Sequence, residues 1–155
     1  MSLQEYILND VEILSLSEKI GEVHRLFNQL TYTHLPVSEN GIYIGCISEN
    51  DVRCFDNDKM LGDYRYALEG FFARESNYWL DSLEAFAQNN SNILPVLNDE
   101  NLYIGYVELN EMISLFKETP FLHEPGNILV VEKAFKDYTL GEVSQIVESN
   151  NAHLL

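Results

Sequence analysis

The spacing of apolar residues changes along the chain, and each spacing predicts a different kind of element. Between residues 17 and 30, apolar side chains recur every three or four positions, which predicts a helix with one buried face, capped by Ser17. From Thr33 to Ile47, β-branched and aromatic residues flank Asn40-Gly41, which predicts two strands joined by a tight turn. Ser48 follows where an N-cap would stand, so we expect a helix from Asp51 to about Phe55.

This order of elements occurs twice. Leu-Pro-Val at 35–37 is repeated at 94–96, and the glycine of the following apolar run is repeated at Gly105. Pro95 follows Pro36 by 59 residues, and Gly105 follows Gly45 by 60. The first helix of the second copy is predicted to begin near Trp79 and to end at Asn89-Asn90. A repeat of this length predicts two supersecondary units that bury their apolar faces against each other.

Both copies contain Leu-Pro-Val followed by an apolar-Gly-apolar run, and in the first copy Ser48-x-x-Asp51 comes next. This pattern resembles the CBS domain. Two copies in one chain resemble a tandem CBS pair, the Bateman module, over about residues 8–118. The resemblance implies an α/β (α+β) fold of two β-α-β-β-α repeats, expected at 1–59 and 60–122. It also implies a short opening strand in each repeat, at Ile13-Leu14-Ser15 and at Phe71-Phe72.

Residues 123–155 have a different pattern. The run 126–132 predicts a strand, and residues 152–155 predict the beginning of another. Between them, one face of a predicted helix carries Leu140, Val143, Ile146 and Val147. This β-α-β order is similar to the first half of an ACT domain. Because the ACT pattern needs about twice this length, we expect a truncated, partial ACT-like segment.

Charge and composition narrow the function classes. The chain has 25 acidic and 9 basic residues, for a net charge of −16, which disfavours binding to nucleic acid. No apolar run approaches the ~20 residues of a membrane span, and the N-terminus lacks the features of a signal peptide. We therefore expect a cytoplasmic protein that binds neither nucleic acid nor membrane, with Cys46 and Cys54 as free thiols.

The resemblance also implies a ligand site. In CBS domains that bind adenosine-type ligands, the motif aspartate accepts hydrogen bonds from both ribose hydroxyls. The motif hydroxyl lies near the phosphate or ribose, and adenine lies between apolar side chains beside the opening strand. These roles correspond here to Asp51, Ser48, Ile13 and Pro36, and His34 is expected to contact a phosphate or carboxylate. Alternatively, Ser48 caps its helix, Asp51 complements the helix dipole and His34 packs on its strand.

In the second copy, Glu108 and Glu111 replace the serine and aspartate of the motif. With Pro95 they would form a degenerate second site. Since Glu108 places a negative charge where a phosphate would lie, we expect this site to be empty or to hold an uncharged group or a cation.

The chain has no recognisable catalytic motif, and its four histidines are not at metal-ligand spacing. We therefore predict a regulatory, homodimeric protein of bacterial type that is not an enzyme and needs no cofactor. Its expected ligand is AMP, ADP, ATP, S-adenosylmethionine or NAD, bound in the cleft between the repeats. The alternative is a ligand-free CBS scaffold for dimerisation or protein interaction, which the acidity and the degenerate second motif favour.

Overall fold

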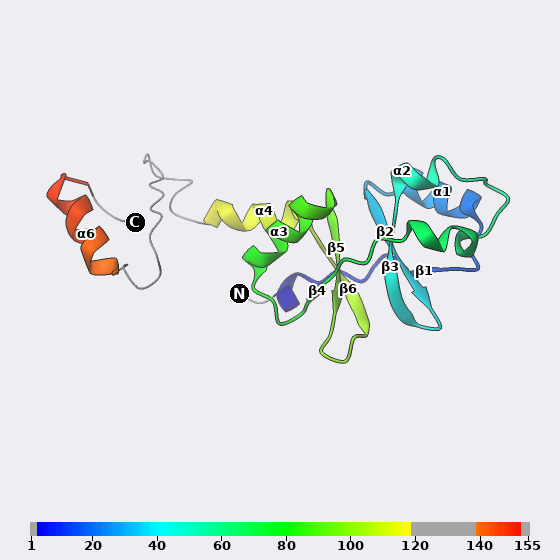
Figure 1. Cartoon of the computed structure of the whole chain (residues 1–155), viewed down its shortest axis with the longest axis horizontal. Coiled ribbons are helices and arrows are strands. Elements are labelled where there is room, and N and C mark those ends of the chain that lie inside the picture. The colour runs from blue at the N-terminus through cyan, green and yellow to red at the C-terminus, as the bar shows by residue number, and fades with distance from the viewer. Residues whose placement is uncertain (1–2, 119–138, 153–155) are drawn as a thin grey trace. The chain divides into compact units, whose positions relative to one another are not determined.

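The computed structural model describes residues 3–118 and 139–152. The chain divides into two compact units, Met1–Ser114 and Leu115–Leu155. The first unit contains two three-stranded sheets, each with its own helices (Figure 1).

The first repeat follows the short 3₁₀ helix η1 (Leu3–Tyr6). Its sheet has the order β1-β2-β3, with β1 parallel to β2 and β2 antiparallel to β3. Its elements are β1 (Leu14–Ser15), α1 (Ile20–Gln29), β2 (His34–Glu39), β3 (Ile42–Ser48) and α2 (Glu49–Val52).

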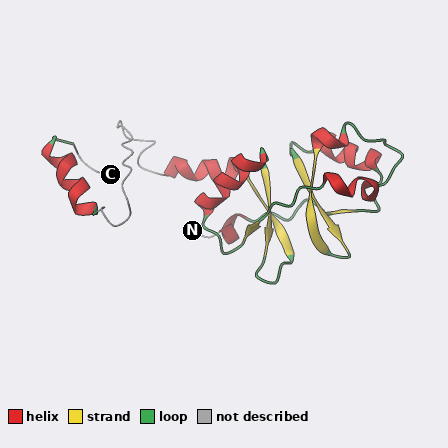
Figure 2. Ribbon diagram, in the orientation of Figure 1, coloured by secondary structure: helices red, strands yellow, loops and turns green. Residues whose placement is uncertain are grey.

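The second repeat has the same topology, with sheet order β4-β5-β6, and follows the 3₁₀ segment η2 (Leu61–Ala67). Its elements are β4 (Ala73–Arg74), α3 (Trp79–Asn89), β5 (Ile93–Leu97), β6 (Tyr103–Glu108) and α4 (Leu109–Ser114). The predicted β-α-β-β-α order is therefore confirmed twice (Figure 2).

The predicted tight turn lies at Asn40-Gly41, where both residues have positive φ, 53° and 81°. Two central residues in the left-handed region are what a type I′ hairpin requires, and Asn-Gly meets that requirement with little strain. The turn joins β2 to β3, and the paired strands bury Leu35, Val37 and Ile47 in the core of the first repeat.

Three predicted elements have wrong boundaries, and one of them, α2, spans Glu49–Val52 rather than Asp51 to about Phe55. Helix α1 begins at Ile20, and its N-cap, Lys19, makes no side-chain hydrogen bond, because the carbonyls of Lys59 and Asn57 accept the first helical N–H groups. Ser17 instead contacts Ser15. The opening strand of the second repeat is Ala73–Arg74, two residues after the predicted position.

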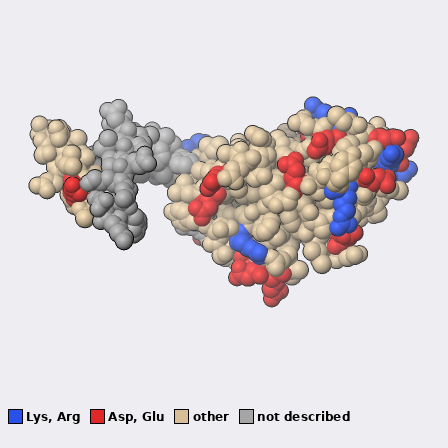
Figure 3. Space-filling view, in the orientation of Figure 1, with Lys and Arg blue, Asp and Glu red and all other residues tan. Residues whose placement is uncertain are grey.

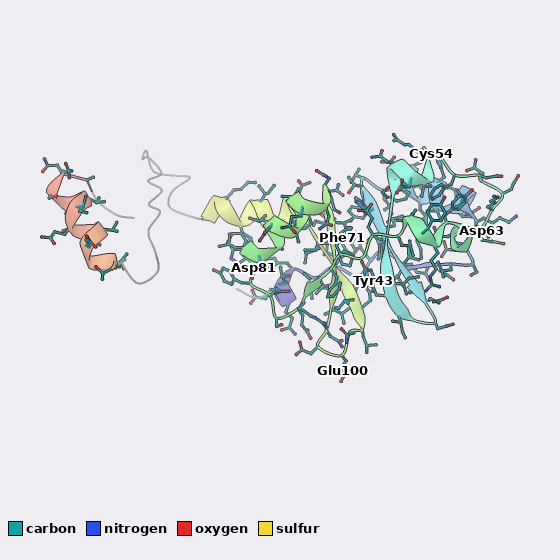
Figure 4. All side chains as sticks on the ribbon, viewed as in Figure 1. Tyr43, Cys54, Asp63, Phe71, Asp81 and Glu100 are labelled. Atoms are coloured by element: carbon teal, nitrogen blue, oxygen red, sulfur yellow. The ribbon has the colours of Figure 1, made fainter. Side chains whose placement is uncertain are left out.

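The segments before β1 and β4 cross to the opposite repeats. Leu8 exchanges two backbone hydrogen bonds of 2.8 Å with Tyr106 on β6, and Glu69 exchanges two of 2.8 Å with Cys46 on β3. Beside the second crossing, the Tyr43 hydroxyl donates to the Phe71 carbonyl at 2.6 Å (Figure 4). Each sheet is therefore extended by a segment that precedes the other repeat.

A glycine lies at each crossing because the two backbones approach closely. Gly45 and Gly105 both have φ of +143°. A Cβ atom would lie 3.0 Å from the Glu69 carbonyl oxygen at Gly45, and only 2.2 Å from that of Leu8 at Gly105. The apolar-Gly-apolar pattern thus marks where the segments cross.

In the second unit the predicted helix is present as α6 (Leu140–Ser149), after the 3₁₀ helix η3 (Leu115–Glu118). Thr139 caps α6, its hydroxyl accepting a hydrogen bond from the N–H of Glu142 at 3.3 Å. The strands predicted at 126–132 and at 152–155 lie outside the described residues, apart from Ala152.

Candidate ligand-binding cleft

A cleft of about 410 Å³ opens between the two repeats of the first unit. The first repeat contributes the start of β2 and the turn from β3 into α2, and the second contributes the end of α3 and the segment before β4. The lining residues are Thr33, His34, Ser48, Glu49, Asn50, Asp51, Glu69, Asn89 and Asn90.

Ser48 and Asp51 form a closed pair at the end of β3. The Ser48 hydroxyl accepts a hydrogen bond from the N–H of Asp51 at 3.1 Å and donates to Asp51 Oδ2 at 2.8 Å. The N-cap prediction is therefore confirmed, and α2 begins directly after Ser48, at Glu49. Asp51 Oδ1 accepts no hydrogen bond from the described residues, so this oxygen is available to a ligand.

His34 lines the cleft and is buried, only 5% exposed. Its Nδ1 lies 2.8 Å from Thr33 Oγ1, and its Nε2 lies 3.4 Å from Glu69 Oε1. Burial lowers the pKa of His34 from its ordinary value, although the nearby carboxylates of Glu69 and Asp51 act in the opposite direction. The ring is therefore neutral at pH 7, and both of its nitrogens already have neighbours.

The charges of the lining are all negative, on Glu49, Asp51 and Glu69. Among the described residues, no lysine or arginine lines this cleft. The nearest arginine in sequence, Arg53, pairs with Glu49 at 2.7 Å. On the face drawn in Figure 3, basic side chains lie beside acidic ones and do not gather in a basic patch.

The predicted site residues do not all meet. His34, Ser48 and Asp51 line the cleft, whereas Pro36 is buried in β2 opposite Cys46. Ile13 is half-buried just before β1 and is not a lining residue. The sequence did not identify Glu69, Asn89 and Asn90 as site residues, because only the crossing of the repeats brings them to the cleft.

The corresponding region of the second repeat is filled by side chains. The strand registers match Cys46 to Tyr106, Ser48 to Glu108 and His34 to Ile93. Tyr106 is fully buried, and its ring centroid lies 5.4 Å from that of Tyr32.

The hydroxyls of Tyr32 and Tyr106 lie 2.9 Å apart between two carboxylates. Tyr106 donates to Asp10 Oδ1 at 2.6 Å, and Tyr32 donates to Glu108 Oε1 at 2.5 Å. Burial is the largest factor raising the pKa of both tyrosines, so both hydroxyls stay protonated and available as donors.

Of the other residues predicted for the second site, Pro95 is buried opposite Tyr106, and Glu111 is exposed in the first turn of α4. Glu108 is engaged by Tyr32. The structure thus shows an open cleft beside Ser48 and Asp51 of the first repeat and a tyrosine pair at the matching position in the second.

The two β-α-β-β-α repeats have the fold of a solved CBS domain pair. Residues 3–56 match the family model of the CBS domain. A CBS domain pair/ACT domain protein from Thermotoga maritima has the same fold, with a TM-score of 0.68 at 20% identity. That match covers 77% of this chain and 99% of the other.

A second solved structure, CBSX2 in complex with AMP, matches with a TM-score of 0.62 at 16% identity. It covers 76% of this chain and 96% of that one. Among curated proteins, inosine-5′-monophosphate dehydrogenase of Methanocaldococcus jannaschii is 24% identical over 147 residues. The match includes 94% of this chain but only 29% of the dehydrogenase.

Two features are absent from the described part of the chain. No helix in residues 3–118 and 139–152 is long and apolar enough to cross a membrane. Within the same part of the chain, no group of three or more His, Cys, Asp or Glu side chains is arranged to hold a metal ion.

Proposed function

We propose that this chain is a regulatory CBS-pair protein that binds an adenosine-containing small molecule in the cleft of its first repeat. The observation that carries the proposal is the cleft of about 410 Å³ built from both repeats around Ser48 and Asp51. This volume falls within the range of small-molecule sites, about 300–1,000 Å³. The role is regulatory rather than catalytic, in a cytoplasmic protein.

The chemistry of Asp51 supports this ligand class. A carboxylate can accept hydrogen bonds from two neighbouring hydroxyls at once, as the 2′ and 3′ hydroxyls of a ribose would require. Asp51 Oδ2 is held by Ser48, whereas Oδ1 accepts no hydrogen bond from the described residues. The AMP held by CBSX2, which shares the fold, is a ligand of the same class.

The position of the cleft suggests how binding would be transmitted. Ser48 and Asp51 belong to the first repeat, whereas Asn89 and Asn90 belong to the second. A ligand that contacts both pairs favours the arrangement of repeats in which all contacts can form, and so shifts the population of conformations. Residues 123–155, which we propose as an ACT-like segment, would receive that signal.

One observation favours the alternative, a ligand-free scaffold. Leu80 on α3 and Ile113 on α4 are 42% and 50% exposed. These two helices contact each other, so their exposed apolar side chains lie on neighbouring elements. A homodimer that covers them would remove this apolar surface from water, and we propose such a dimer in either case.

Isothermal titration calorimetry and thermal unfolding of the full chain test the ligand. The probes are adenosine, AMP, ADP, ATP, S-adenosylmethionine and NAD. A probe at 100 times its Kd should stabilise the protein by about 2.7 kcal/mol. Asp51→Ala should abolish this stabilisation.

Glu111→Ala is the matched control, because Glu111 occupies the equivalent motif position of the second repeat. It should leave binding unchanged. Binding that survives Asp51→Ala would contradict the assigned site. Binding of none of the probes, combined with a dimeric mass in sedimentation equilibrium, would instead support the scaffold.

A further inference from the structure

We propose that this cleft selects an adenosyl compound whose 5′ substituent is uncharged or cationic, and that it disfavours adenine nucleotides. Glu69 is the residue that sets this preference. The inference rests on the proposed function and narrows its ligand class. It follows from the charge of the lining, from the state of His34 and from the position of Glu69.

The cleft offers nothing to balance a phosphate. Its lining carries three carboxylates and, among the described residues, neither lysine nor arginine. The arginines of the first unit nearest in sequence to the cleft have other partners. Arg53 pairs with Glu49 at 2.7 Å, and Arg65 pairs with Glu39 at 2.7 Å. A ligand with a charge near −2 would thus enter a field of the same sign.

His34 does not supply the missing positive charge. Its ring is buried, and its two nitrogens face Thr33 Oγ1 and Glu69 Oε1. A phosphate would have to displace Glu69 from Nε2 and also protonate a ring whose burial favours the neutral form.

Two N–H groups at the start of helix α2 are already used within the protein. It contains four residues, Glu49–Val52, and the N–H of Asp51 already donates to the Ser48 hydroxyl. The first N–H of the turn, on Glu49, donates to the carbonyl of Thr33 at 2.9 Å. Both of these amide donors are therefore occupied within the protein.

Glu69 is fixed where it can distinguish ligands by charge. Two backbone hydrogen bonds to Cys46 hold the residue in place, and its carboxylate lies 3.4 Å from His34 Nε2. The side chain is nevertheless 43% exposed, so it remains accessible from the cleft. A sulfonium or ammonium group beside it would gain an ion pair, whereas a phosphate would be repelled.

Calorimetry at low ionic strength tests the preference with two matched pairs of probes. Adenosine and AMP differ by a phosphate. S-adenosylmethionine and S-adenosylhomocysteine differ by one methyl group, which makes the sulfur a sulfonium cation. We expect AMP to bind at least tenfold more weakly than adenosine. We expect S-adenosylmethionine to bind at least tenfold more tightly than S-adenosylhomocysteine. A tenfold difference in affinity is about 1.4 kcal/mol.

Glu69→Gln should shrink both ratios, and Glu69→Lys should reverse the order of adenosine and AMP. Glu100→Gln is the control, since it makes the same change of charge at the tip of the β5–β6 hairpin, away from the cleft (Figure 4).

The possible failures are distinguishable. If no adenosyl compound binds, the proposed function fails, and this inference fails with it. If AMP binds the wild-type chain as tightly as adenosine, the charge selection is overturned while the adenosyl site stands. If Glu69→Gln and Glu100→Gln change the two ratios equally, the assignment of the preference to Glu69 is overturned.

Discussion

The two repeats share a backbone plan but differ where a ligand would bind. In the first repeat the register position after Gly45 holds a cysteine, whereas in the second the position after Gly105 holds Tyr106. Ser91, which precedes β5, matches Tyr32, which precedes β2. Small, buried side chains therefore stand at the two positions that tyrosines occupy around the second repeat.

The comparison shows that a duplicated fold need not provide two equal sites. The two repeats still make reciprocal hydrogen bonds to each other just before β2 and β5. The N–H of Thr33 donates to Asn92 Oδ1 at 2.8 Å, and the N–H of Asn92 donates to Thr33 Oγ1 at 3.1 Å. The backbone symmetry thus persists while the side chains differ: one repeat keeps an open cleft beside its motif, and the other buries Tyr106.

Removing a ring from the second repeat should have the largest effect on stability. Tyr106→Ala deletes a fully buried ring and should lower the free energy of unfolding by about 3–5 kcal/mol. Cys46→Ala, at the matching position, deletes one sulfur atom and should cost only about 1 kcal/mol. Urea unfolding measured by circular dichroism gives both values.

Tyr106→Phe separates the ring from its hydroxyl, which donates to Asp10. It should cost about 1–2 kcal/mol, because Asp10 loses a partner while the packing remains. Equal costs for Tyr106→Ala and Cys46→Ala would show that the tyrosine does not fill the second region.

Replacing the glycines at the two crossings should give losses of stability that differ less from each other. Gly105→Ala places a Cβ atom 2.2 Å from the carbonyl oxygen of Leu8 and should cost at least about 2 kcal/mol, since both the clash and the positive φ are unfavourable. Gly45→Ala meets the Glu69 carbonyl oxygen at 3.0 Å and should cost less, at about 1–2 kcal/mol.

The same urea titrations measure both glycine variants. A larger loss for Gly45→Ala than for Gly105→Ala would mean that Leu8 does not approach β6 as closely as the structure shows.

The smallest effect should be a pH dependence that only the first repeat possesses. His34 matches Ile93, and its pKa is lowered in the folded state by burial. The unfolded chain therefore binds the proton more readily, so this contribution to stability is complete above pH ~6.5 and is lost as the pH falls below it.

His34→Gln should accordingly flatten the decrease in the urea midpoint between pH 7.5 and pH 5.5. An unchanged slope in His34→Gln would show that the ring does not titrate differently on folding.

The sequence predicts local features well and contacts between the repeats poorly. The repeat register, the Asn40-Gly41 turn and the Ser48 cap follow from neighbouring residues, and all three are present. The pairing of Tyr32 with Glu108 joins residues 76 positions apart, and no local pattern encodes it.

One signal in the sequence was nevertheless available. Aligning the copies at Gly45 and Gly105 places Cys46 opposite Tyr106, a difference in size at a position expected to be buried. The start of α1 could not be predicted in this way, because its first N–H groups donate to the carbonyls of Lys59 and Asn57 rather than to Ser17.

The crossing of the opening segments also bears on how such a fold assembles. A chain with one repeat could extend its sheet only by taking a segment from a second molecule, as domain-swapped dimers do. Placing both copies in one chain turns that encounter between molecules into an intramolecular one, at an effective concentration set by the linker. The covalent link therefore raises the local concentration of each repeat around the other. Their pairing does not depend on how much protein the cell contains.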